Sequence, residues 1–105
     1  MADMMKIRAR LKDGVTEVKV LMIHPMETGR RIDDAGETVP AHFIQLVTAM
    51  LNGKTVLEAQ WGTGISKNPY LTFRLRGANL GDKIAVNWVD NKGATNAIEG
   101  VVEGA

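Results

Sequence analysis

The chain has 105 residues, 45% of them hydrophobic and 24% charged, a composition that fits one globular domain and argues against disorder. The 13 basic and 12 acidic residues leave a formal net charge of +1, which argues against nucleic-acid binding and against a basic membrane-surface helix. The chain contains no cysteine, which excludes disulfides, thiolate nucleophiles, iron–sulfur ligation and most structural zinc sites.

The N-terminal residues contain no apolar segment of the kind that marks a secretory signal. No apolar run approaches the roughly 20 residues that a membrane-spanning helix requires. These two observations by themselves predict a cytoplasmic protein that does not associate with a membrane.

Two strands are predicted in the first quarter of the chain. From Met5 to Lys12 three apolar side chains alternate with four basic ones, and a period of two marks a half-buried strand. Asp13-Gly14 supplies turn chemistry, and a second alternating run extends from Val15 to Ile23. Pro25 cannot donate a ladder hydrogen bond and is expected to end that strand.

Residues 24–39 lack a clear periodicity and form the longest irregular connection of the chain. Gly29, Asp33, Asp34 and Gly36 indicate turns within it. Connections longer than about 12–15 residues are often functional or cross between sheets, so we expect one of these roles here.

Five further strands follow, separated by turn residues. Asn52-Gly53 between two alternating runs predicts a hairpin, because a type I′ turn needs positive φ at both central residues. The predicted strands are Phe43–Leu51, Lys54–Trp61, Tyr70–Arg76, Lys83–Val89 and Ala94–Glu103.

The pattern as a whole predicts an all-β protein, since no segment shows a sustained 3.6-residue apolar stripe. Seven short strands in about 100 residues favour an immunoglobulin-like antiparallel β-sandwich of about seven strands. We expect it to form a single domain over residues 1–105. The cysteine pair of antibody domains is absent, so the expectation concerns the architecture only.

His24 and His42 are the only histidines, and each stands at the end of an expected element. One interpretation is a shared metal site or a proton-transfer pair. The carboxylates able to complete such a site are Glu27, Asp33, Asp34 and Glu37. Two partly exposed structural histidines are the favoured interpretation, because catalytic metal sites usually supply about three protein ligands.

No other segment carries a catalytic motif. Ser66 is the only serine and lacks a Gly-x-Ser-x-Gly frame, and the glycines of residues 61–67 lack the Walker spacing. Lys6, Arg8, Arg10 and Lys12 form a basic stripe that suits an acidic partner surface. The favoured interpretation of this stripe is a solvated face or an edge strand protected against aggregation.

Several runs along the chain resemble the SoxZ family, in order and over nearly the whole length. They are His24–Gly29, Pro40–Ile44, Asn52–Gly62, Ser66–Tyr70, Gly81–Lys83 and Trp88–Gly93. The resemblance implies an immunoglobulin-like, non-catalytic subunit that needs no cofactor and pairs tightly with SoxY. In that family the C-terminal arm of SoxY carries sulfur species on a cysteine and visits the other thiosulfate-oxidising enzymes.

The resemblance also changes the expected compartment. The SoxYZ carrier works in the periplasm, and SoxY bears a twin-arginine export signal, so we expect this chain to cross the membrane with its folded partner. An isolated chain is expected to form a homodimer through the vacant interface.

Polar, proline-bearing runs at strand ends are the expected partner surface or the surroundings of the SoxY arm, because sandwiches place recognition loops there. The residues of this predicted partner surface are His24, Pro25, Met26, Glu27, Pro40, His42, Phe43, Asn68, Pro69 and Tyr70.

Two alternatives remain open. The first is a superoxide-reductase-like iron protein, whose His-Pro and His-aromatic-Ile runs are similar to those here. That site requires four histidines and one cysteine, and this chain has two histidines and no cysteine. The second alternative is a structural sandwich module with no specific partner.

Overall fold

The computed structural model describes residues 5–105, and it contains seven strands and no helix in that range. The strands are β1 (Lys6–Lys12), β2 (Val15–Leu21), β3 (Ile44–Leu51), β4 (Lys54–Gln60), β5 (Tyr70–Arg76), β6 (Lys83–Asp90) and β7 (Thr95–Gly104). Each predicted strand is present, with bounds that differ by at most two residues. Consequently, no described helix is available to cross a membrane.

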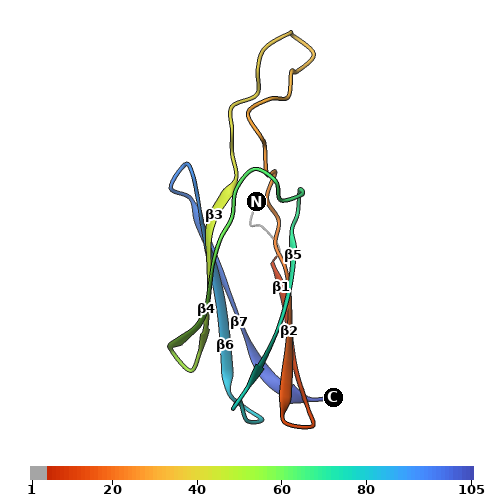
Figure 1. Cartoon of the computed structure of the whole chain (residues 1–105), viewed down its shortest axis with the longest axis vertical. Coiled ribbons are helices and arrows are strands. Elements are labelled where there is room, and N and C mark those ends of the chain that lie inside the picture. The colour runs from red at the N-terminus through yellow and green to blue at the C-terminus, as the bar shows by residue number, and fades with distance from the viewer. Residues whose placement is uncertain (1–4) are drawn as a thin grey trace.

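The seven strands form one curled sheet in the order β4-β3-β6-β7-β1-β2-β5. Its two halves face each other as the layers of a sandwich (Figure 1). Strand β7 belongs to both layers, because it pairs with β6 from Thr95 to Val101 and with β1 from Val102 to Gly104. The β1–β7 pair is parallel, whereas the other neighbours are antiparallel, so the all-β prediction is confirmed with one parallel pair added.

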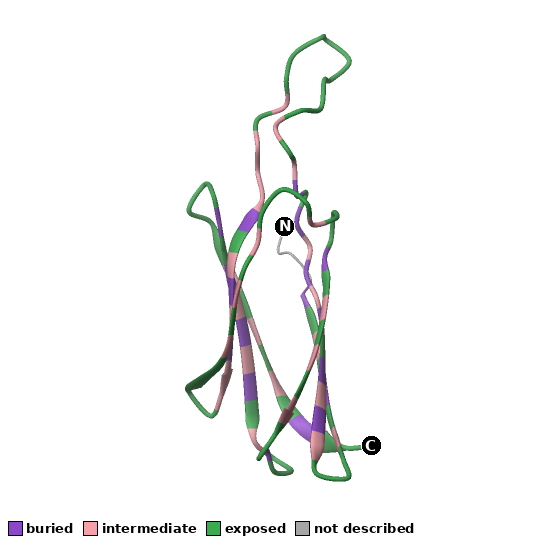
Figure 2. Cartoon of the chain, in the orientation of Figure 1, coloured by how far each residue is buried: buried purple, intermediate pink, exposed green. Residues whose placement is uncertain are grey.

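The core lies between the two layers and is built from apolar residues that alternate along the strands. Figure 2 shows this as buried positions that alternate with more exposed ones, for example along β2 and β6. Val18 and Val20 of β2 belong to the same buried cluster as Val47 of β3 and Val86 of β6, and all four are fully buried. Burial of an aliphatic side chain contributes roughly 1.5–3 kcal/mol, so this cluster stabilises the fold substantially.

The hairpin between β3 and β4 has the predicted turn chemistry. Asn52 and Gly53 have φ values of 51° and 85°, and the backbone of a type I′ turn requires both to be positive. The register shifts by one residue between Ala49 and Met50, which leaves Val56 unpaired and exposed. The bulge therefore twists the β4 edge of the sheet.

Residues 27–42 form an arm that extends beyond the sandwich (Figure 1). Its two sides pair at Glu27↔His42 and at Ile32↔Thr38, and its turn at the tip is closed by the Asp33 side chain. Ile32 near the tip is 58% exposed. The connection predicted to be irregular is therefore a narrow, self-paired arm without a core of its own.

Candidate functional site

Three segments that are distant in the sequence meet at the base of the arm. The Met22 N–H donates to the Pro69 carbonyl at 2.9 Å, and the Asn68 N–H donates to the His24 carbonyl at 2.9 Å. The Asn68 side chain accepts in return from the His24 N–H at 3.0 Å. The Glu27–His42 bridge then joins both to the far side of the arm, so five of the predicted partner-surface residues meet here: His24, Glu27, His42, Asn68 and Pro69. Tyr70 instead lies beside Lys19 and Leu21.

These residues differ strongly in their exposure. Exposed side chains belong to Pro25, Pro40, Asn68 and Tyr70. Half-buried side chains belong to Glu27, His42 and Phe43. Buried side chains belong to His24, Met26 and Pro69. The three buried residues support the surface from beneath. The prediction that both histidines are partly exposed is therefore wrong for His24.

His24, His42 and Asp90 form a cluster that we call the histidine end. His24 Nε2 lies 3.0 Å and His42 Nε2 lies 2.7 Å from the same Asp90 Oδ2 atom. The two imidazole rings meet edge to face at 4.5 Å, and Trp88 packs against His24 from within the core at 5.0 Å. One carboxylate thus joins β6 to both sides of the arm.

The Asp90 carboxylate accepts four hydrogen bonds in a nearly solvent-free position. Its Oδ1 atom accepts from the backbone N–H groups of Lys92 at 3.0 Å and Ala94 at 2.9 Å. Burial alone would raise the pKa of Asp90, but the bonds from the two histidines and these N–H groups lower it from 3.8 to about 2. Asp90 is therefore a charged, fully satisfied carboxylate in the interior.

The hydrogen bonds also determine the tautomer of His24. The Met26 N–H donates to His24 Nδ1 at 3.1 Å, so that atom has no proton and the ring proton is on Nε2. This Nε2–H donates to Asp90. His24 is consequently a structural bridge between the arm and β6.

His42 has a different environment, because its side chain is 27% exposed. Its Nε2 atom bonds to Asp90, whereas its Nδ1 atom has no hydrogen-bond partner among residues 5–105. A cavity of about 440 Å³ adjoins it, and Lys67 and Asn68 belong to the cavity wall. The Asp90 bond thus holds the His42 ring in place beside the cavity.

The donor set of the histidine end has the size of a metal site, since one ligand atom from each of His24, His42 and Asp90 lies within 4.8 Å of the others. To bind a metal here, His24 would have to offer the lone pair of its Nε2 atom, but in this network Nε2 carries the ring proton. Binding would require this proton to move to Nδ1 and the Met26 hydrogen bond to break. The geometry therefore favours a hydrogen-bonded network over a metal centre.

The carboxylates that the sequence offered as able to complete a metal site do not form hydrogen bonds with the histidine side chains. Asp33 closes the arm tip, and Glu27 binds the Arg31 guanidinium at 2.7 Å, a contact that lowers the pKa of the carboxyl group. Sequence reasoning missed Asp90. The signal was available, because Ile84, Val86 and Trp88 alternate inward on β6 and Asp90 is the next position on that face.

A comparison of the sequence with protein families gives a match over most of the chain. The family model described as "Sulphur oxidation protein SoxZ" matches residues 5–100, which include most of the sandwich, the arm and the histidine end. A search of curated proteins found no match. The family match confirms the resemblance in the sequence runs, and the chain belongs to the SoxZ family.

Proposed function

We propose that this member of the Sox sulfur-oxidation system is the non-catalytic half of a carrier and scaffolds the cysteine-bearing SoxY subunit. The observation that carries the proposal is chemical. Covalent carriage of sulfur requires a thiolate, and a SoxZ-family chain without cysteine can only hold and present a partner that has one.

The proposed contact surface for SoxY begins at the base of the arm. Pro25, His42, Phe43, Asn68 and Tyr70 all have solvent-accessible side chains there. The hydrogen bonds beneath them hold this surface in one conformation before binding, and preorganised surfaces lose less entropy when they associate.

The outer face of β3 and β6 continues this surface and supports stable pairing. The side chains that point outward from these neighbouring strands carry no charge between Leu46 and Met50 or between Ala85 and Val89. Depletion of charge is typical of the centre of a permanent interface. When the chain is isolated, we propose that this face pairs with a second copy.

Intact-mass measurement of the native complex after addition of thiosulfate tests the division of labour. We expect sulfur adducts on SoxY and an unmodified mass for this chain. An adduct on this chain, or turnover of thiosulfate by this chain alone, would refute the proposal.

Alanine substitution at the surface tests the contact itself. We expect Phe43→Ala with Tyr70→Ala to weaken the heterodimer by at least about tenfold, because aromatic side chains contribute strongly to binding. Val56→Ala, an exposed position on the edge strand β4, is the matched control. Equal affinity of the double variant and the control would place the interface elsewhere.

We propose a periplasmic location, reached together with SoxY. Cell fractionation with SoxY carrying or lacking its export signal tests this. The chain should enter the periplasm only with the signal-bearing partner, and export without that partner would contradict the proposal.

Two alternatives make different predictions for the purified protein. A superoxide-reductase-like iron protein requires stoichiometric iron, which metal analysis would detect. A structural module with no specific partner would not co-purify with SoxY from the native source.

A further inference from the structure

The outer face of β1, β2 and β5 concentrates positive charge. The antiparallel register places Arg8 of β1, Lys19 of β2 and Thr72 of β5 in one row across the sheet. The other rows of outward-pointing residues also run across these three strands. We call the outward-pointing cations of these strands the basic face. They are Lys6, Arg8, Arg10, Lys12, Lys19, Arg74 and Arg76.

Within these three strands few carboxylates balance this charge, although Glu103 of the neighbouring β7 stands beside Arg10 in the register. Glu17 is the one acidic residue on the outer face of these three strands, and it contacts Lys19 at 3.7 Å and Arg74 at 3.4 Å. The five other cations form no ion pair with any residue from 5 to 105. Thus seven of the 13 basic residues share one face of a chain whose net charge is only +1.

Protection of a sheet edge does not explain this face. The sheet order places β4 and β5 at the edges, whereas β1 lies inside the sheet between β7 and β2. Protection of an outermost strand therefore does not account for the cations of β1, although Lys6 and Arg8 flank the end of β1 that β7 leaves unpaired. Of the two interpretations favoured from the sequence, a solvated face is the main alternative to a binding surface.

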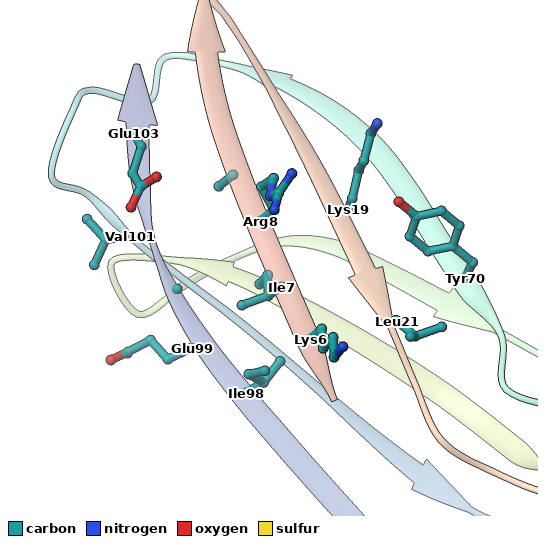
Figure 3. A pocket seen from close by; sticks show the side chains of 12 residues that line it. Lys6, Ile7, Arg8, Lys19, Leu21, Tyr70, Ile98, Glu99, Val101 and Glu103 are labelled. Atoms are coloured by element: carbon teal, nitrogen blue, oxygen red, sulfur yellow. The ribbon is translucent and has the colours of Figure 1, made fainter. Parts of the chain in front are cut away.

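A groove of about 890 Å³ adjoins the basic face along one half of β1 (Figure 3). The groove opens because β1 pairs with β7 only from Ala9 to Leu11. On the N-terminal side of Ala9, toward Lys6, the two strands are not paired. Its lining combines cations such as Lys6 and Lys19 with apolar side chains such as Leu21. Tyr70 stands at its side and is 63% exposed.

We propose that the basic face and its groove are a docking surface for an acidic patch of a transient protein partner. This docking surface meets the proposed SoxY contact surface only at Tyr70, and its cations lie outside that contact surface. Exposed cations with no internal partner attract a carboxylate-rich surface over several ångströms and raise the association rate. The apolar groove accommodates a side chain of that partner and gives the contact a fixed orientation.

The charge pattern favours a protein over a nucleic acid. Glu17 lies within the face, and Glu99 and Glu103 line the groove, so a continuous phosphate backbone would meet repulsive groups. A protein surface can place its own basic residues opposite these carboxylates. The occupant inferred is therefore a folded protein with a predominantly acidic surface.

A titration of the full chain with a short poly-L-glutamate peptide, followed by NMR, tests the face directly. We expect shifts confined to β1, β2 and β5, and at least roughly tenfold weaker binding for the Arg8→Glu, Lys12→Glu double variant. The matched control is Lys54→Glu with Lys83→Glu, which changes the net charge equally on β4 and β6 and should keep most of the affinity.

Three outcomes would overturn the proposal: an equal loss of affinity in the control variant, shifts spread over the whole surface, or tighter binding of an oligodeoxythymidylate of the same formal charge than of the peptide. The last outcome would indicate a nucleic-acid site.

A second measurement uses the complete carrier and rests on the proposed function. With the purified thiosulfate-oxidising enzymes, the Arg8→Glu, Lys12→Glu carrier should show a roughly tenfold higher KM, and the salt dependence of its KM should decrease. Heterodimer formation with SoxY should be unchanged. An unchanged KM with an intact heterodimer would contradict the docking surface, whereas failure of the wild-type chain to bind SoxY would count against the proposed function alone.

Discussion

At the histidine end the Asp90 carboxylate is 1% exposed and accepts four hydrogen bonds, whereas on the basic face five cations point to solvent without an ion pair from residues 5–105. Both regions are charged, yet the charge has different consequences. A buried carboxylate must be compensated inside the fold, and its loss leaves donors unpaired. An exposed cation contributes little to stability and remains available for recognition.

This difference indicates where substitutions should affect folding and where they should affect binding. The histidine end joins β6 to both sides of the arm, so it holds the contact surface for SoxY in shape. The basic face has no such internal role. The following measurements test that division, beginning with the largest expected effect.

Asp90→Ala should lower the free energy of unfolding by about 3–5 kcal/mol, because it removes the buried acceptor that both histidines and two backbone N–H groups share. Urea denaturation measures this change. Glu58→Ala on the exposed outer face of β4 is the control and should change stability by less than about 0.5 kcal/mol. Similar values for the two variants would remove the distinction between the regions.

His24→Phe should lower the free energy of unfolding by about 2 kcal/mol, since it leaves Asp90 and the Met26 N–H each without one hydrogen bond. His42→Phe should lower it by about 1 kcal/mol, because water can reach the exposed side of that position. The comparison by denaturation gives the order directly. A larger effect at His42 would contradict the structural role assigned to His24.

Acidification should destabilise the protein through Asp90. Its pKa is about 2 in the folded chain against an ordinary value of 3.8, so its stabilising contribution is complete above about pH 4 and is lost as the pH falls toward 2. The loss amounts to about 2 kcal/mol. Denaturation curves from pH 5 to pH 2 should show this decrease in the wild type and a smaller one in Asp90→Asn.

The Arg8→Glu, Lys12→Glu variant should change the free energy of unfolding by less than about 0.5 kcal/mol, because neither cation forms an ion pair in the described chain. Thermal denaturation at low and high salt measures this. A loss comparable to that of Asp90→Ala would mean that the basic face holds the fold together.

Much of the fold could be predicted from local sequence. Strict alternation marked the strands, and Asn52-Gly53 marked the β3–β4 hairpin, because side-chain period and turn dihedrals depend on neighbouring residues alone. The same alternation extended by one step would have found Asp90. The runs that resemble the SoxZ family, such as His24–Gly29, identified the family that the match over residues 5–100 confirms.

What the sequence determined by itself is the set of seven strands, the inward face of each and the absence of a thiol. Only the tertiary structure decided which strands are neighbours. His24 meets Asp90 across 66 positions, and the β1 stripe becomes a basic face because β2 and β5 lie beside it in register. The physical reason is that strand order and register depend on packing of the whole core, which no local pattern contains.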